Sequence, residues 1–565
     1  MKRLIGIIMG LVVVLASGCS NIPTTGPVEE VPYSPQPRGI DIAPEPPAEG
    51  VTPIRLVEGF LQAMADPAED YAVARQYLTT DAASQWDPET AQVVLTTVTT
   101  EAEGGVRVEG DLLGELDDAG RLTSAYRPFT YEFGLVREDG EWRIGTAPEG
   151  LLLSRYIFER YYSHVPLYFM SRAGTHVVPD LRHVPEALLT PTWVVDALLD
   201  GSSPQLVRTV SNAFPSNVTL GPDMAKIDSQ GVVTVDLLGL DTAMTGDARR
   251  ALGAQLIWSL TSIPRVTGLV ITQGGVGFAL PGSNAAGVLE LAGQLGYQVL
   301  SRGATPNLYG IREGVPGRVS EEAQFVPLTP QADGSADVAV SLDGVSVAYV
   351  DESRTGLSLG QLGGQVSPVK AEFTNLRAPQ FALGALWLLG DGTDGVTRLL
   401  TLDRSEHVVA VGTTLPEGAV VEAFAVSPTR ARLALVVRSG QVRTLSLTAV
   451  LPSGTETDGS WPLHMVSPRG SEITDVTAVS WQSETALAFI GSSASGRSVF
   501  LAQSDGSLVE DLGPVVGDVA EITAMARLGG GSVAIRNEAG MVWRFEARTR
   551  WNRIIEDISA ISFGA

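Results

Sequence analysis

The amino-acid sequence predicts a multidomain fold made of an α+β domain, an α/β domain and a C-terminal all-β propeller. Three observations support this prediction. Helical apolar spacing gives way to strand-like runs in residues 52–158, strands alternate with helices in residues 160–300, and a two-strand motif repeats through residues 310–565. A chain of 565 residues is long enough for three or four domains of ordinary size.

The first domain, residues 52–158, is predicted to place helices before an antiparallel sheet. Apolar residues recur at helical spacing from Ile54 to Met64, and a second helix follows near residues 71–78. Strand-like runs come next, and Asp139-Gly140 lies between two of them as a hairpin signal. Helices followed by a curved sheet resemble the NTF2-like α+β cone, which often encloses a pocket. No charged pair in this segment points to catalysis, so a packed scaffold domain is the favoured interpretation.

The second domain, residues 160–300, alternates strands and helices. An apolar helix around Trp193 is closed by Gly201, and residues 231–237 alternate cleanly as a strand. A long helix from about residue 247 to 262 carries its leucines on one face, and this spacing predicts an amphipathic helix.

Part of this second domain resembles a known interaction module. The run Ala254–Thr261, followed by Pro264 and the strand Val270–Thr272, is similar to the GerMN domain, as is Gly231–Asp236 before it. GerMN domains occur in spore-germination, sporulation and envelope lipoproteins. The resemblance implies that residues 160–300 bind a partner and do not catalyse a reaction.

The third domain, residues 310–565, contains an internal repeat. Each copy has two short apolar strands joined by a polar turn, followed by a more variable hairpin. The period of about 43 to 54 residues is that of a β-propeller blade, whereas a β-sandwich fits the repeat less well. Ile558–Phe563 matches one more first strand, which would join the first blade and close a ring of about five or six blades. The anchor residues of the five copies are Val338, Phe381, Phe424, Ala478 and Thr523.

The chain begins with the three parts of a secretory signal. A positively charged start precedes an apolar run of about 12 residues, which is shorter than the roughly 20 needed to span a bilayer. Small residues then lead to Cys19, the only cysteine of the sequence, which therefore has no disulfide partner within the chain. The stretch Leu15–Cys19 resembles a bacterial lipobox, with Ala16 where leucine is usual.

The lipobox resemblance implies how the chain is processed. Residues 1–18 would be a signal peptide cleaved after Gly18, and Cys19 would become an S-diacylglycerol, N-palmitoyl cysteine. Several acyl chains hold a protein stably on a membrane where one is marginal. Residues 19–51 are rich in proline and acidic residues, so they are expected to form an extended tether.

Composition restricts the partners of the protein. The formal net charge is −25, and loss of Lys2 and Arg3 with the signal would make it two units more negative. Nucleic-acid binding needs a basic surface, so nucleic acid is excluded as a partner. Attraction to anionic lipid headgroups is disfavoured for the same reason, and attachment to the membrane would depend on the lipid at Cys19.

Sequence patterns typical of catalysis or metal binding lack the context that they need. Gly356–Gly360 matches the G-x-S-x-G pattern of hydrolases, but no helix follows it. Asp391–Gly395 resembles part of a calcium loop without the glutamate that completes such a loop. The five histidines do not have zinc-protease spacing, although His176 and His183 could approach each other. We therefore predict no catalytic residue, no cofactor and no metal site.

The order of lipobox, NTF2-like segment, GerMN domain and propeller resembles the LpqB lipoproteins of actinobacteria. This resemblance implies a non-enzymatic protein anchored to the outer face of the cell membrane, where it binds the ectodomain of an MtrB-type sensor histidine kinase. It would then be an accessory of a two-component system that affects the cell wall and division. One alternative is a protein that binds cell-wall glycan or peptide in the cone pocket or the propeller channel. Another is a propeller hydrolase or lactonase, which would need a ring of carboxylates at the channel mouth.

Overall fold

The computed structural model describes residues 44–301, 307–320, 323–329, 332–403, 405–514, 518–546 and 550–564. Within these residues no helix is both long and apolar enough to cross a membrane.

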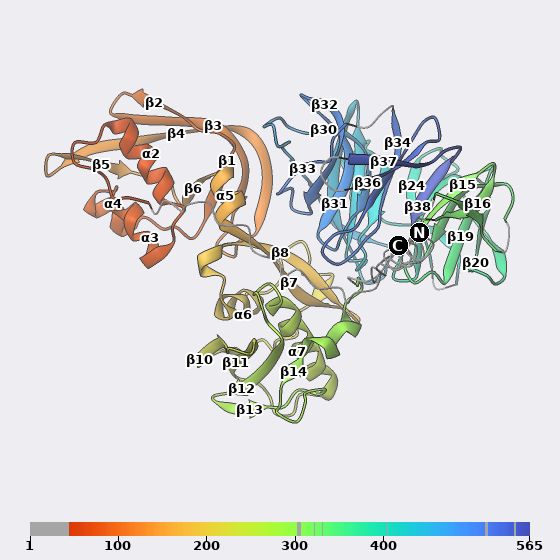
Figure 1. Ribbon diagram of the computed structural model, residues 1–565, viewed down its shortest axis with the longest axis horizontal. Helices are drawn as coiled ribbons and strands as arrows, with labels where there is room; N and C mark the ends of the chain where they lie inside the picture. The colour runs from red at the N-terminus through yellow and green to blue at the C-terminus, as the bar shows by residue number, and fades with distance from the viewer. Residues whose placement is uncertain are drawn as a thin grey trace, which may run out of the picture. The chain divides into compact units, whose positions relative to one another are not determined.

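The N-terminal domain places three helices on one side of a twisted sheet (Figure 1). The sheet has the order β5-β4-β3-β1-β6, and β2 pairs with β3. Helix α2 buries Leu56, Val57 and Phe60 in the core of this domain, as its apolar spacing predicts. The elements are α2 (Pro53–Ala63), α3 (Ala68–Arg75), α4 (Thr80–Gln85), β1 (Ala91–Val94), β2 (Val98–Ala102), β3 (Gly105–Leu116), β4 (Leu122–Glu138), β5 (Glu141–Thr146) and β6 (Leu151–Ser154).

The predicted hairpin at Asp139-Gly140 joins β4 to β5. Glu138 pairs with Glu141, so the loop has two residues. Both loop residues have positive φ, 53° and 86°, which is the conformation that favours Asp-Gly in such turns. Helix α4 and the short strands β1, β2 and β6 were not predicted from the sequence. The likeness of this domain to the NTF2-like cone stays a prediction.

The second domain is built around a parallel β-α-β unit. Strands β11 and β12 are parallel neighbours, and helix α7 connects them. Antiparallel strands complete the sheet in the order β10-β11-β12-β13, and the β7–β8 hairpin forms a second, smaller sheet with β9. The elements are α5 (Arg155–Tyr161), β7 (Tyr162–Ser171), β8 (Val177–Pro185), η1 (Glu186–Leu188), α6 (Pro191–Leu199), β9 (Val210–Ser211), β10 (Thr219–Ile227), β11 (Val232–Leu238), α7 (Gly246–Leu260), β12 (Gly268–Gln273), β13 (Val276–Phe278), β14 (Leu289–Glu290) and η2 (Leu291–Tyr297).

Helix α7 differs from the amphipathic helix predicted for residues 247–262. All nine residues from Leu252 to Leu260 are buried, including the polar Gln255 and Ser259. The prediction of an exposed polar face is therefore wrong for this half of the helix. The reason is that strand β12 packs on one side of α7, whereas β7 and α6 pack against its other sides.

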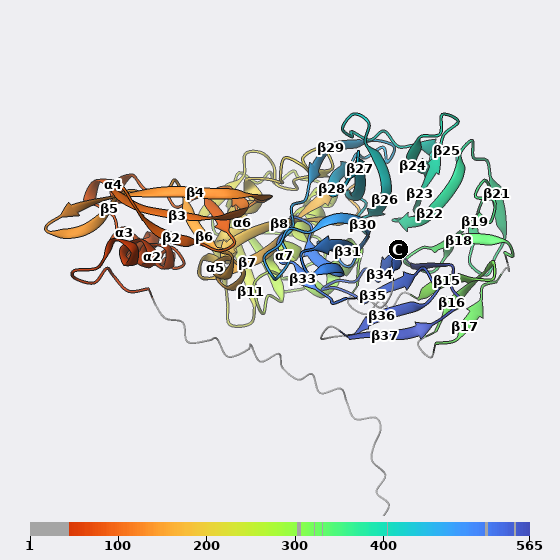
Figure 2. The same ribbon diagram turned by 90° about the horizontal axis from the view of Figure 1, so that it is seen from above.

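The C-terminal domain consists of six four-stranded antiparallel sheets arranged in a ring (Figure 2). The innermost strands, in ring order, are β38 (Ala560–Phe563), β18 (Ser335–Val340), β22 (Thr374–Ala382), β26 (Val420–Val426), β30 (Thr474–Trp481) and β34 (Val519–Ala524). The outer strands are β15 (Leu308–Arg312), β16 (Val315–Val319), β17 (Phe325–Pro327), β19 (Ser346–Asp351), β20 (Leu357–Gln361), β21 (Val366–Val369), β23 (Ala385–Asp391), β24 (Thr397–Leu402), β25 (Val408–Ala410), β27 (Arg432–Ser439), β28 (Val442–Val450), β29 (Thr457–Pro462), β31 (Ala486–Ser493), β32 (Gly496–Gln503), β33 (Glu510–Asp511), β35 (Val533–Asn537), β36 (Val542–Glu546) and β37 (Arg550–Ile555).

The first and last strands of the propeller share one sheet. Strand β38 pairs antiparallel with β15, with Phe563 opposite Leu308. The predicted role of Ile558–Phe563 in closing the ring is thereby confirmed, and each of the five repeat anchors lies in an innermost strand. Closure leaves no open edge at the point where the chain of blades begins and ends.

Candidate functional site

The residues singled out in the sequence are not brought together into one centre. Gly18 and Cys19 lie outside the described residues, so cleavage and lipidation stay predictions. Ser358 of the G-x-S-x-G match lies in β20, paired with β19 on one side and β21 on the other, so the strand-turn-helix that this motif requires is not formed. In the described parts of the chain, no three His, Cys, Asp or Glu side chains gather as metal ligands would.

The Asp391–Gly395 segment is the turn between β23 and β24. The Asp394 carboxylate makes an ion pair with Arg398, four residues later on β24. This pair and a backbone hydrogen bond from Val396 hold the pKa of Asp394 well below its usual range. The carboxylate therefore stabilises a turn.

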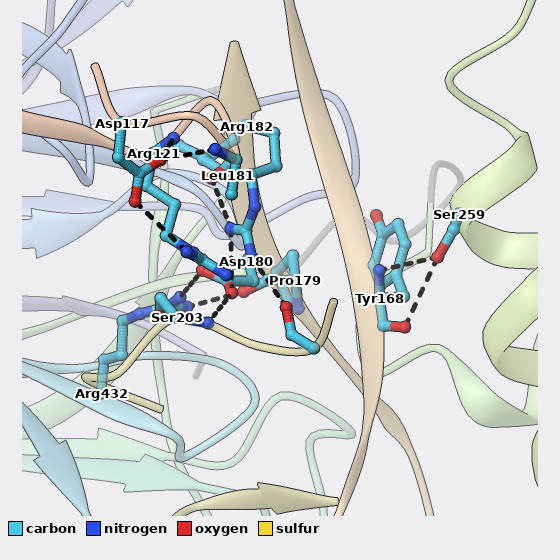
Figure 3. A network of polar contacts seen from close by, with 12 residues as sticks. Asp117, Arg121, Tyr168, Pro179, Asp180, Leu181, Arg182, Ser203, Ser259 and Arg432 are labelled. Carbon is cyan, nitrogen blue, oxygen red and sulfur yellow. Dashed lines mark hydrogen bonds and ion pairs between the residues drawn. The ribbon is translucent and has the colours of Figure 1, made fainter. Parts of the chain in front are cut away.

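The structure instead reveals a cluster of buried charges where the second domain meets the propeller. The Asp180 carboxylate of β8 lies 3.0 Å from a guanidinium nitrogen of Arg182 and accepts a hydrogen bond of 2.6 Å from the Ser203 N–H. Arg432 of the propeller reaches across the junction to within 3.6 Å of Asp180 and donates to the Pro179 carbonyl at 2.8 Å (Figure 3). Burial lowers the pKa of Arg432, and the charge of Asp180 opposes this shift.

The local fold explains why these charges need partners. Strand β8 is buried along nearly its whole length because the β7–β8 hairpin lies between α7 and the propeller. The side chain of Arg182 has no exposed surface and that of Asp180 is only 5% exposed. An isolated charge in such surroundings would cost several kcal/mol, so each one is held by opposite charge and hydrogen bonds. We refer to Asp180, Arg182, Ser203 and Arg432 as the junction cluster.

A second contact joins all three domains at His183. Its Nε2 lies 2.6 Å from an Asp505 oxygen of the propeller, and its backbone N–H donates to the Gly120 carbonyl of the N-terminal domain at 2.7 Å. Its Nδ1 lies 2.7 Å from Nδ1 of His164, so one of these two nitrogens donates and the other accepts. Burial would raise the pKa of Asp505, but the charge and hydrogen bond of His183 outweigh it and lower that pKa to about 2.

His176 and His183, which could have approached each other, lie apart at strand and loop positions. The antiparallel register of β7 and β8 places His164 opposite His183, whereas His176 lies before β8 with its Nε2 3.1 Å from the Thr429 carbonyl of the propeller. Burial, with a smaller contribution from His183, lowers the pKa of His164 to about 4. The two histidines that do meet are thus in a buried pair.

A third contact across the junction involves a buried carboxyl group. Glu484 follows β30 in the propeller and is 3% exposed. One of its oxygens accepts long hydrogen bonds from the Tyr168 hydroxyl (3.3 Å) and the Gln298 amide (3.4 Å) of the second domain. Its other oxygen has no hydrogen-bond partner in the part of the chain that the structure describes. Burial raises the pKa of Glu484 to about 7, although both hydrogen bonds oppose the shift.

These contacts link charged and polar groups of different domains. Asp180, Arg432, His183 and Asp505 are all directed at groups in another domain or at one another, so their chemistry is to hold domains together. Sequence reasoning missed them, although a signal existed. Asp180, Arg182 and His183 interrupt the otherwise apolar run Val177–Pro185, and a charge in such a run needs a buried partner.

The fold and these contacts define a class of protein: a multidomain β-propeller protein with two N-terminal domains docked through buried polar groups. Residues 46–159 match the family model described as "Lipoprotein LpqB, N-terminal domain", and residues 320–559 match "Lipoprotein LpqB beta-propeller domain". Residues 166–276 match the model described as "Sporulation and spore germination".

Two relatives are both described as "Lipoprotein LpqB". The protein from Mycolicibacterium smegmatis is 31% identical over 70% of this chain and 71% of its own length. The protein from Cutibacterium acnes is 29% identical over 99% of this chain and 98% of its own length. This chain therefore belongs to the LpqB lipoprotein family, whose name describes membrane-anchored proteins of the cell envelope. Among solved structures, TolB from Acinetobacter baumannii matches with a TM-score of 0.36 and 12% identity, over 57% of this chain and 86% of that one.

Proposed function

We propose that this protein is a non-catalytic accessory of an MtrB-type sensor histidine kinase, anchored by a lipid on Cys19 to the outer face of the cell membrane. Through the kinase it would influence genes of the cell wall and division. The observation that carries the proposal is the use of buried charges to join three domains, because it fixes several surfaces of a propeller protein relative to one another. Family membership supports the same proposal.

The physical basis is confinement to a surface. A lipid at Cys19 would keep the protein in the plane that also holds the kinase ectodomain. Two tethered partners meet at a high effective concentration, so that contacts too weak to be seen in solution become occupied. Propellers present broad surfaces of loops, which suit a contact with another protein.

The test compares the full-length protein with Cys19→Ser, reconstituted in proteoliposomes together with the full-length kinase. We expect the lipidated protein to change the rate of kinase autophosphorylation. Cys19→Ser should need a bulk concentration about 100-fold higher or more for the same effect, since tethering commonly contributes 10² to 10⁴ in avidity.

The binding surface is tested separately with the purified kinase ectodomain in solution. Cys19→Ser and the wild-type chain should bind it with equal affinity, because the lipid contributes location and not contact. Absence of saturable binding, together with an unchanged autophosphorylation rate at every concentration, would refute the proposal.

A further inference from the structure

A cavity of about 1000 Å³ runs along the axis of the propeller. The innermost strands of all six sheets line it, which makes it the central channel of the ring. At one end it is lined by Thr175, His176 and the segment Gln298–Ser301, which leads out of the second domain. Leu300 in this segment is 2% exposed, so an apolar side chain fills space at that end.

The opposite end of the channel carries charges of both signs. Asp337, Glu422 and Glu521 occupy the third position of their innermost strands, and each is paired with an arginine. Asp337 lies 2.8 Å from Arg354, Glu422 lies 2.6 Å from Arg443, and Glu521 lies 2.7 Å from Arg536. Each carboxylate is thus neutralised by an arginine, in contrast to the bare ring of carboxylates that a hydrolase or a metal site would need. Of the arginines at this end, Arg354 and Arg377 line the cavity and offer donors beside these acceptors.

The middle of the channel is apolar. Ala423, Ala478 and Ile522 follow the charged level in three successive innermost strands and line the cavity. The aromatic residues of the wall are packed between the sheets and are at most 7% exposed, so they offer no open face on which a sugar ring could stack. The Ser562 hydroxyl also lies on the wall, buried and without a hydrogen-bond partner among the described residues.

The dimensions suit a single extended chain. An innermost strand of six residues, such as β18, spans roughly 20 Å at ~3.3 Å per residue. A cavity of about this length and volume has a mean cross-section of at least roughly 50 Å², which exceeds the ~4.8 Å spacing between paired strands and so admits an extended chain.

We propose that the channel binds an extended peptide segment of a partner protein, which enters through the charged end and places small or apolar side chains against Ala423 and Ala478. For the identity of the partner this inference rests on the proposed function: the segment belongs to the kinase ectodomain. Arg354, Arg377 and the three carboxylates at the mouth would exchange hydrogen bonds with the backbone and polar side chains of that segment.

The test fills the channel of the full-length protein. Ala423→Phe and Ala478→Phe each add a ring to its apolar wall. Val442→Phe is the matched control, since Val442 is 61% exposed in the same sheet as Ala423 but outside the channel. Binding is measured by interferometry against the intact kinase ectodomain and against synthetic overlapping peptides that span it. We expect one region of the peptide series to bind, and both channel variants to weaken peptide and ectodomain at least 10-fold, with Val442→Phe unchanged.

Hydrogen exchange of the wild-type chain tests the channel site independently, even if a channel variant fails to fold. The binding peptide should protect backbone amides of the innermost strands, above all in residues 420–426 and 474–481. Ectodomain binding that survives both channel variants, or protection confined to another surface, would overturn the channel site and leave the proposed function standing. Failure of the ectodomain to bind at all, together with an unchanged rate of kinase autophosphorylation in proteoliposomes, would overturn both proposals. Channel protection by soluble peptidoglycan glycan chains but by no peptide would replace the peptide with a sugar ligand.

Discussion

At the scale of single residues, Glu484 shows how a buried carboxyl group at the domain junction lowers the stability of the protein. Its carboxyl group is buried between the propeller and the second domain, near Tyr168 and Gln298, and its hydrogen bonds are long. Burial raises its pKa from 4.5 to about 7. The folded protein therefore keeps a proton that the unfolded chain loses between pH 4.5 and 7, so Glu484 lowers stability progressively over that range, and the full penalty applies above pH 7.

Glu484→Gln should remove this pH-dependent penalty. We expect the variant to unfold at a higher temperature than the wild type at pH 8 and to differ little from it at pH 5. The difference in free energy between the two pH values is on the order of 3 kcal/mol at most. Thermal denaturation at both pH values measures it, with Glu510→Gln at an exposed carboxyl as control. An equal effect of Glu484→Gln at pH 5 and pH 8 would contradict the prediction.

Asp180 is the counter-charge for two buried arginines. Asp180→Asn preserves shape but leaves Arg182 and Arg432 without their carboxylate, and breaking a buried pair in this way costs roughly 3 to 5 kcal/mol. We expect a lower unfolding temperature and faster proteolysis between the second domain and the propeller. Asp394→Asn, which breaks the surface pair with Arg398, should leave both measurements nearly unchanged. Similar behaviour of the two variants would show that the junction cluster does not stabilise the joint.

At the scale of elements, helix α7 shows how a polar residue can be structural. The Ser259 hydroxyl oxygen accepts a hydrogen bond of 2.8 Å from the Tyr168 N–H of β7. The Gln255 side-chain oxygen accepts one of 2.8 Å from the Ala213 N–H. Ser259 therefore holds the helix to the hairpin that carries Asp180 and Arg182, and Gln255 holds it to the segment that follows β9.

Ser259→Ala should show how much the stability of the protein depends on the hydrogen bond between Ser259 and Tyr168. The Tyr168 N–H would lose its acceptor inside the core, at a cost of about 1 to 3 kcal/mol. Ser262→Ala, three residues later on the same chain, should cost less, because Ser262 is only partly buried and donates to the Ser259 carbonyl. Chemical denaturation of both variants compares the two losses; an equal loss would assign no special role to the Ser259–Tyr168 bond.

The same helix marks where prediction from sequence succeeded and where it stopped. Its existence, its end near Pro264 and the strand after it follow from local spacing. The repeat in residues 310–565 predicted the innermost strand of five sheets and the closing strand. The burial of Gln255 and Ser259 could not be predicted, because it depends on distant segments, the residues after β9 for Gln255 and strand β7 for Ser259. The junction cluster was missed for the same reason, since Asp180 and Arg432 are more than two hundred residues apart in the sequence.

At the scale of the whole molecule, closure of the ring is the feature on which the propeller depends. Strand β38 supplies the innermost strand of the sheet that also holds β15, β16 and β17. Its backbone N–H groups at Ile561 and Phe563 also donate to Glu521 and Thr523 of the neighbouring sheet. One short strand thus forms hydrogen bonds with two sheets at once.

Deletion of residues 558–565 should therefore destabilise far more than one strand. It would expose β15 and the edge of β34, and we expect the cooperative unfolding transition of the propeller to be lost or strongly lowered. Scanning calorimetry of the full-length and shortened proteins measures this. A matched substitution, Val396→Ser in an exposed turn, should leave the transition in place. A shortened chain that unfolds like the full-length protein would show that closure is dispensable.

The order in which such a ring can form has a kinetic consequence. Ser559 donates a hydrogen bond to the Ile311 carbonyl, although the two residues are 248 positions apart in the sequence. Loops of that length close with a large entropic cost, and contacts so distant along the chain form late and slowly. The early blades are synthesised first but must wait for the last strand before the ring is complete. During that interval their open edges can pair with other chains, so the time between synthesis of residue 308 and arrival of residue 563 is when this protein is most exposed to aggregation.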